Sequence, residues 1–169
     1  MPSFEYDIVW QKLDDATRDR IVAFWQTHGA IRDEQAARAR VDQVVALARN
    51  ENDEIAGVCT AVDLVVPDIG ERLYYYRTFV APPFRTGFVV RRLLFLAVQA
   101  LEEHARHHVE TSAKGVYLEL ENPSFARHLR QAVWPRRGLE FVFIGRTARG
   151  LERRVRWFEH ARIGDSAGG

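Results

Sequence analysis

The segment from Leu73 to His104 constrains the fold of this chain more than any other, because it joins an aromatic strand to a long apolar helix through a short turn. The turn contains Arg85, Thr86 and Gly87. The first N–H groups of a helix have no partner within that helix, so a helix beginning here directs them into the turn. Such an arrangement suits an anion such as a pyrophosphate. The segment predicts a ligand-binding loop, with an ordinary strand-to-helix connection as the alternative.

The elements around this loop follow from hydrophobic periodicity. Residues 54–66 are rich in β-branched side chains, and residues 71–81 follow a turn signal at Pro67 to Gly70, so a β-hairpin is predicted. After the loop, a helix is predicted from Phe88 to His108, with one face made of Val90, Leu93, Leu94, Ala97, Leu101 and His104.

The first fifty residues predict a strand followed by two helices. The strand covers Tyr6 to Leu13, and Asp14 and Asp15 are N-cap candidates for a helix that Gly29 ends. Its periodic face is made of Ile21, Phe24, Trp25 and His28. The second helix is expected to begin near Asp33 and to continue as far as residue 50, with a face made of Ala37, Val41, Val44, Val45 and Ala48.

This order of elements predicts an α/β fold, in which helices flank both faces of a mixed, mostly antiparallel sheet. A full crossover helix links the strand ending near Val80 to a strand beginning near Gly115, so these two strands are expected to be parallel. The length of 169 residues, with 47% hydrophobic and 28% charged residues, suits one domain over residues 1–163 and a flexible tail over 164–169.

Composition also bounds the location of the protein. The single cysteine, Cys59, cannot form an internal disulfide and is expected in the core. The chain begins without the charged and apolar pattern of a signal peptide, so a cytoplasmic location is expected. The longest apolar stretch, Leu93 to Leu101, is too short to cross a hydrocarbon layer of ~30 Å.

The loop and helix resemble the motif V-x-P-x-x-R-x-x-G-x-G-x-x-L-L of the GNAT-type N-acetyltransferases. Five residues match in register, with Phe88 and Val90 in the places of the two glycines: Val80, Pro82, Arg85, Leu93 and Leu94. Residues 115–129 are similar to the fifth strand of that family and to the asparagine, here Asn122, that opens its next helix. Residues 138–145 resemble its "GF" strand. Where the family often has an acid tyrosine, this chain has Leu129 or Arg130.

The resemblance implies a GNAT-like fold whose parallel strands diverge to admit the pantetheine arm of acetyl-CoA. No metal is implied. The cosubstrate would contact the backbone at the end of the aromatic strand, the loop amides and the asparagine, which gives the set Phe79, Val80, Arg85, Thr86, Gly87, Phe88, Val89, Val90 and Asn122.

Two carboxylates and a tyrosine are the catalytic candidates. Glu119 and Glu121 are two residues apart on one predicted strand, so both share a face with Tyr117, and either is a candidate general base for an amine. The alternative is a rim position paired with arginine, for example Arg77. Tyr76 is the candidate acid for the departing thiolate, and the alternative places its ring in the core or the cleft wall.

The histidines and arginines of the C-terminal half carry weaker signals. His104, His107 and His108 lack further ligands at metal-site spacing, so helix-end histidines are expected rather than a metal site. Ten arginines against three glutamates between residues 126 and 162 suit either a phosphate-bearing ligand or a solvated surface. No recognised nucleic-acid motif accompanies them.

The sequence therefore predicts an acyl-CoA-dependent N-acyltransferase acting on an amine of a small molecule or peptide. The alternative is a catalytically inactive GNAT-fold binding or regulatory module, which the replaced loop glycines and the missing acid tyrosine favour. A homodimer formed through the hairpin of residues 141–157 is a further expectation.

Overall fold

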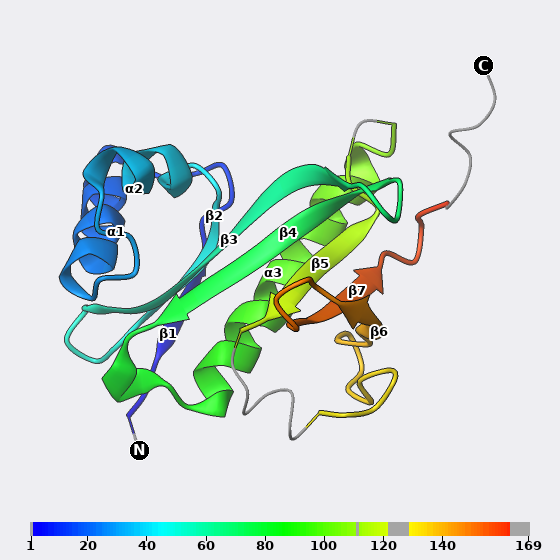
Figure 1. Cartoon of the computed structure of the whole chain (residues 1–169). Coiled ribbons are helices and arrows are strands. Elements are labelled where there is room, and N and C mark those ends of the chain that lie inside the picture. Colours follow the sequence, from blue (N-terminus) through cyan, green and yellow to red (C-terminus); the bar gives the residue numbers. More distant parts are fainter. Residues whose placement is uncertain (1, 111, 122–128, 163–169) are drawn as a thin grey trace. The chain divides into compact units, whose positions relative to one another are not determined.

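The computed structural model of this chain describes residues 2–110, 112–121 and 129–162 (Figure 1). Along the chain the elements are β1 (Glu5–Ile8), α1 (Asp15–Thr27), α2 (Glu34–Val41), β2 (Val44–Arg49), β3 (Ile55–Val66), β4 (Glu71–Val80), the 3-10 turn η1 (Pro82–Phe84), α3 (Gly87–His107), β5 (Gly115–Leu120), β6 (Val142–Arg146) and β7 (Glu152–Trp157). The sheet order is β1-β2-β3-β4-β5-β7-β6. The mixed α/β class is confirmed, since β4 and β5 are parallel while β1–β2, β2–β3, β5–β7 and β6–β7 are antiparallel.

The described residues group into two compact units. Of these residues, unit 1 comprises 2–61 and Arg77–Ala100, and unit 2 comprises Val62–Tyr76, 101–110, 112–121 and 129–162. The boundary between the units falls within β3, β4 and α3, so each of these elements belongs to both. A single domain over residues 1–163 stays a prediction, and the expected tail over 164–169 lies outside the described residues.

Unit 1 is built around β2 and β3, with α1 and α2 packed together as Figure 1 shows. Both helices begin at an aspartate N-cap, because Asp14 accepts from the backbone N–H of Thr17 and Asp33 from that of Ala36, each at 2.7 Å. Successive side chains of β3 point to opposite faces of the sheet. Val58 packs into the core that also contains residues of α1 and α2, whereas a Cβ on Gly57 would lie 3.1 Å from Leu93 of α3.

The predicted second helix is wrong in its second half. The helix α2 ends at Val41, and residues 44–49 form β2, which pairs with both β1 and β3. All side chains from Val44 to Ala48 are buried, so this strand has no polar face and shows no period of two. The spacing of Val41, Val44, Val45 and Ala48 also fits a helix. A short, continuously apolar run does not distinguish the two structures.

The predicted long helix is confirmed as α3, although its buried face is displaced from the predicted one. Its buried residues are Val89, Leu93, Leu94, Ala97, Val98, Leu101 and Ala105, whereas Val90 and His104 are half-buried. His28 after α1, expected on the apolar face, is exposed. In the part of the chain that the structure describes, no helix combines the length and the apolar character needed to cross a membrane.

Unit 2 places β5 between the parallel strand β4 and the antiparallel strand β7. Tyr74 pairs with Val116 and Tyr75 with Tyr117 across the parallel pair. On the other side, the register with β7 runs from Gly115 opposite Trp157 to Leu120 opposite Glu152. The predicted C-terminal hairpin is confirmed as β6 and β7. The three neighbouring strands β4, β5 and β7 therefore bring residues that are distant in sequence onto one face of the sheet.

Arg154 on β7 organises the polypeptide beside the hairpin. Its side chain is only 1% exposed. It donates hydrogen bonds to the carbonyl oxygens of Leu129 at 3.1 Å and Phe141 at 3.3 Å, and to a carboxylate oxygen of Glu152 at 3.3 Å. Its guanidinium carbon lies 5.0 Å from the centre of the Trp134 ring. Part of the arginine-rich C-terminal third is therefore structural and not a solvated surface.

Candidate functional site

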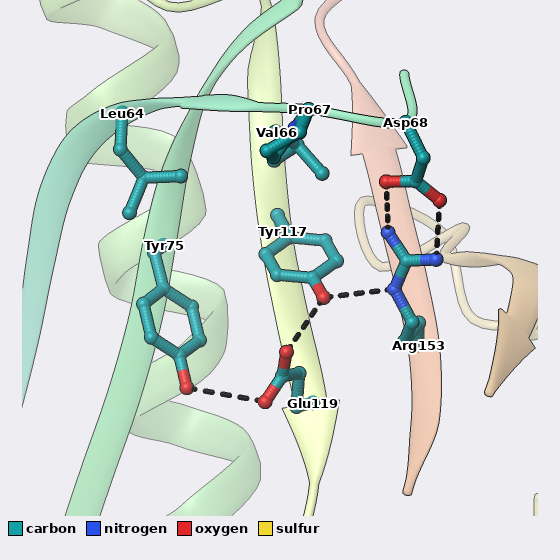
Figure 2. Close-up of a pocket in the computed structure, with 8 residues that line it drawn as sticks. All are labelled: Leu64, Val66, Pro67, Asp68, Tyr75, Tyr117, Glu119 and Arg153. Carbon is teal, nitrogen blue, oxygen red and sulfur yellow. Dashed lines mark hydrogen bonds and ion pairs between the residues drawn. The ribbon is translucent and has the colours of Figure 1, made fainter. Parts of the chain in front are cut away.

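A cavity of about 310 Å³ opens in unit 2 (Figure 2). Four strands, β3, β4, β5 and β7, and the turn between β3 and β4 contribute to its wall. The lining residues are Leu64, Val66, Pro67, Asp68, Tyr75, Tyr117, Glu119 and Arg153. All eight belong to the same compact unit, so the geometry of the cavity is defined within that unit.

Strand register brings the polar lining residues together. Tyr117 and Glu119 are two residues apart on β5 and therefore point to the same side of the sheet. Tyr75 on β4 is the register partner of Tyr117, and Arg153 on β7 is the register partner of Glu119. Paired residues share a face, so three adjacent strands present these four side chains to one cavity.

The four side chains and Asp68 form a continuous hydrogen-bond chain, drawn as dashed lines in Figure 2. The hydroxyl of Tyr117 donates to one oxygen of Glu119 at 2.8 Å, and that of Tyr75 donates to the other at 3.4 Å. Arg153 Nε donates to the Tyr117 oxygen at 2.9 Å, and its two terminal nitrogens donate to Asp68 at 2.6 and 2.7 Å. Because Arg153 can only donate, the hydroxyl proton of Tyr117 is directed to Glu119.

Electrostatics assign different roles to these groups. Burial raises the pKa of Tyr117 to about 12, a hydrogen bond from Arg153 opposes that shift, and Glu119 adds to it. Tyr117 is therefore protonated at neutral pH. The hydrogen bonds from Arg153 hold the pKa of Asp68 below its usual range. Glu119 differs from Asp68 in that its described hydrogen bonds come from the neutral hydroxyls of Tyr75 and Tyr117 and not from a cation, and a carboxylate so placed is a candidate general base.

The cavity has a polar end and an apolar end. In Figure 2 both tyrosine hydroxyls point toward Glu119, whereas Leu64 and Val66 lie at the opposite end of the two rings. The ring centres of Tyr75 and Tyr117 are 5.6 Å apart. Val66, Tyr117 and their neighbours also form a small apolar core that supports this end of the cavity.

The three catalytic candidates from the sequence occupy different environments. Glu119 lines the cavity. Glu121 follows the end of β5 and is exposed, while Tyr76 is 6% exposed and adjacent to Tyr75 on β4, so strand alternation turns it to the other side. Tyr75 and Arg153 also line the cavity, although neither is among the site residues predicted from the sequence. Three consecutive tyrosines on a predicted strand indicate that at least one ring faces each side of the sheet. Which ring faces Glu119 depends on the strand register, and the sequence does not specify that register.

The predicted anion loop lies in unit 1, at the end of β4. Arg85 Nε donates to the carbonyl oxygen of Val80 at 2.9 Å, and its guanidinium carbon lies 5.3 Å from the ring centre of Phe79. The carbonyl of Thr86 accepts from the backbone N–H of Val90 at 3.4 Å, which marks the beginning of α3. Arg85 therefore anchors the loop to the strand that precedes it.

The two residues in the glycine positions of the motif differ in exposure. Phe88 is 62% exposed and Val90 is half-buried, while Val89 between them is fully buried. A Cβ added to Gly87 would meet no described atom within 4 Å, so the first turn of α3 is open to a ligand on that side. The helix N-terminus and the charge of Arg85 fit an anionic group such as a pyrophosphate. Asn122, the remaining predicted cofactor residue, lies outside the described residues.

The helix-end histidines and the cysteine have structural surroundings. His107 contacts Glu103 at 2.9 Å, and the rings of His104 and His108 stack at 4.4 Å. Over the described ranges, no group of three potential metal ligands is found. Cys59 is buried, and its thiol contacts the carbonyl oxygen of Ala46 at 3.5 Å, which agrees with the expected core position.

Comparison with known proteins places the fold. No protein-family model and no curated protein sequence matches this chain. Among solved structures, a GNAT-family acetyltransferase from Streptococcus pneumoniae is 12% identical with a TM-score of 0.62, covering 92% of this chain and 99% of its own. The ribosomal-protein-S5-alanine acetyltransferase from Vibrio fischeri is 8% identical with a TM-score of 0.63, covering 96% and 99%.

A third solved structure contains a cofactor. It comes from Salmonella typhimurium, has acetyl-CoA bound, and is 12% identical with a TM-score of 0.61, covering 97% of this chain and 99% of its own. The three likenesses extend over nearly the whole length of each protein while the sequences have diverged widely. The chain therefore has a GNAT-like fold.

Proposed function

We propose that this GNAT-fold chain is an acyl-CoA-dependent N-acyltransferase, with acetyl-CoA as donor and an amine of a small molecule or peptide as acceptor. One observation carries the proposal: the carboxylate of Glu119 faces a cavity beside the parallel strand pair and accepts hydrogen bonds from two tyrosines. The acetyl-CoA in the Salmonella structure supports the choice of donor. A cytoplasmic location is part of the proposal, supported by the single buried Cys59.

The proposed reaction requires a neutral amine. Glu119 accepts a proton from the acceptor ammonium, and the freed nitrogen lone pair attacks the thioester carbonyl. A C–N bond forms and the C–S bond breaks, the nitrogen loses a second proton, and the thiolate takes up a proton. The products are the amide, the free thiol of CoA and the proton held by Glu119. The hydrogen bonds from Tyr75 and Tyr117 hold the carboxylate in one orientation, which reduces the entropy lost in reaching the reactive geometry.

The proton donor to the thiolate is proposed from the sequence to be Tyr76. Tyr76 lies on β4, but it is 6% exposed and faces the side of the strand opposite Tyr75, which is the tyrosine of β4 that contacts Glu119. Binding of the donor is proposed to involve Arg85, the open side of Gly87 and the first amides of α3. When bound, acetyl-CoA would supply the activated acyl group.

The second candidate function is a GNAT-fold module that binds or regulates without transferring an acyl group. The observation in its favour is the loop itself. Phe88 and Val90 stand where the motif has glycines, and Arg85 Nε is engaged by the carbonyl of Val80. A backbone with bulky side chains approaches a pyrophosphate less closely than one with glycines.

Calorimetric titration of the full chain with acetyl-CoA and CoA distinguishes the two functions. An acyltransferase binds acetyl-CoA and then releases free thiol when a suitable amine from a broad panel is added. The release is followed with a thiol reagent. A chain that shows no heat of binding with either compound, and no amine-dependent thiol release, would refute the acyltransferase and leave the binding module as the remaining candidate.

A further inference from the structure

We propose that the cavity in unit 2 selects a small primary amine whose body is apolar and carries no carboxylate. This inference names the acceptor class for the proposed acyltransferase and rests on that function for its catalytic meaning. The recognition itself depends on residues of one compact unit and is measurable without a cosubstrate.

The charge distribution of the cavity favours a cation. Its ionised groups are Asp68, Glu119 and Arg153. Arg153 forms a two-pronged ion pair with Asp68 at 2.6 and 2.7 Å, so these two charges neutralise each other. The described hydrogen bonds to Glu119 come from the neutral hydroxyls of Tyr75 and Tyr117. Among the described lining residues, one negative charge, that of Glu119, is therefore left for the ligand at the polar end of the cavity.

The same ion pair disfavours an acceptor with a carboxylate next to its amine, such as a free amino acid. A second carboxylate near Glu119 would need a cation, and Arg153 already directs both terminal nitrogens to Asp68 and its Nε to Tyr117. Without a new partner, the two like charges repel each other at short range in a partly desolvated site. Asp68 is therefore a specificity-determining residue, because its ion pair with Arg153 keeps the guanidinium from pairing with a carboxylate of the ligand.

The opposite end of the cavity is suited to an apolar body. Leu64 and Val66 lie beyond the rings of Tyr75 and Tyr117, away from Glu119 (Figure 2). A ligand with its ammonium at Glu119 and a short ring or chain toward these residues would satisfy both ends. Tyrosine faces also attract ammonium groups. The volume of about 310 Å³ is at the lower end of the range for ligand pockets, which suits a small molecule.

Three matched probes test this recognition on the full chain, without any CoA compound, by calorimetry or by NMR shifts. The probes are 2-phenylethylamine, L-phenylalanine, which adds a carboxylate, and 2-phenylethanol, which replaces the ammonium. We expect the amine to bind at least tenfold more tightly than either of the others. Equal affinity for the amine and the amino acid, or no binding of the amine at millimolar concentration, overturns the proposal.

Two variants identify the residues responsible. Glu119→Gln should remove the preference for the amine over the alcohol, whereas Glu103→Gln, the same change at an exposed position of α3 in unit 2, should leave it unchanged. Asp68→Asn should release Arg153 and raise the affinity for L-phenylalanine relative to the amine. A preference that survives Glu119→Gln contradicts the assignment, as does an Asp68→Asn chain with unaltered selectivity.

The outcomes separate this inference from the proposed function. Selective binding of the amine by a chain that binds no acetyl-CoA would refute the acyltransferase and leave the recognition site intact. Conversely, a chain that binds acetyl-CoA and acylates other amines, while showing no preference among the three probes, would refute the recognition site alone.

Discussion

At the scale of single residues, two neighbouring arginines of β7 have opposite roles because successive side chains on a strand point to opposite faces. Arg153 faces the cavity and pairs with Asp68. Arg154 is buried on the other side and binds carbonyl oxygens and Glu152. Sequence alone shows two adjacent cations in a basic segment. The pleat of the strand makes one a recognition residue and the other a structural one.

Removal of Arg154 should destabilise the protein strongly. Arg154→Ala removes the buried cation beside Glu152 and one of the donors to the carbonyl oxygens of Leu129 and Phe141, and breaking a buried ion pair in this way costs about 3–5 kcal/mol. Arg146 also pairs with Glu152, at 3.6 Å, but 58% of its side chain is exposed. Arg146→Ala is therefore the matched control, with an expected cost of about 1 kcal/mol or less. Urea denaturation measures both, and similar losses for the two variants would contradict this role of Arg154.

The raised pKa of Tyr117 should appear in the pH dependence of stability. Burial raises this pKa to about 12 in the folded protein, while an unfolded tyrosine titrates near 10. The folded state therefore binds the phenolic proton more tightly, and the stability contributed is complete below about pH 10 and is lost as the pH rises toward 12. Between pH 10 and 12 the free energy of unfolding should therefore fall less for Tyr117→Phe than for the unmodified chain. Urea melts at pH 9.5 and 11.5 measure this fall, and an equal fall for the two chains would show that the pKa of Tyr117 is not raised.

At the scale of elements, the sequence predicts most of the helices and strands from periodicity and turn residues. The hairpin of β3 and β4, the loop and α3 follow from local patterns alone. The strand β2 does not, because Val44 to Ala48 are covered on both faces and their spacing also fits a helix. Tertiary pairing with β1 and β3 decides the structure there, and pairing between distant segments leaves no local signal.

The close approach of β5 and β7 depends on a glycine. A Cβ on Gly115 would lie 2.5 Å from the carbonyl oxygen of Arg156, so Gly115→Ala must displace the strand backbone. We expect a loss of about 1–3 kcal/mol, as for other overpacked sites. Gly87→Ala is the control, because a Cβ there meets no described atom within 4 Å and alanine favours a helix. Thermal or urea melts compare the variants, and an unaffected Gly115→Ala chain would refute the tight contact.

At the scale of the whole molecule, the fold class is predictable from the order of elements, whereas the candidate site is not. Asp68 and Arg153 are 85 residues apart, and Tyr75 and Glu119 are 44 apart. Only the sheet order, with β5 between β4 and β7, makes them neighbours. Glu119 was recognisable because a carboxylate within an apolar strand is unusual. Its partners depend on strand register, which sequence periodicity does not specify.

The prediction of a single domain has a direct test in unfolding. The elements β3, β4 and α3 each contribute to both compact units, so loss of one unit should break strands and a helix of the other. We expect one cooperative transition, with coincident curves for far-ultraviolet circular dichroism and tryptophan fluorescence. Tryptophans in both units report the process, Trp25 in one and Trp134 in the other. Two separated transitions would indicate two domains.

The measurement that tests the account most directly is the turnover of Glu119→Gln with a proven amine acceptor, alongside its affinity for acetyl-CoA. The account predicts that turnover falls by roughly 10²–10⁴-fold while acetyl-CoA affinity is unchanged, because a general base acts on the amine and not on the donor. Glu121→Gln, an exposed carboxylate beyond β5, should keep full activity. Full turnover in Glu119→Gln would contradict the claim that Glu119 is the general base. The hydrogen-bond chain that lines the cavity would then have a structural role only.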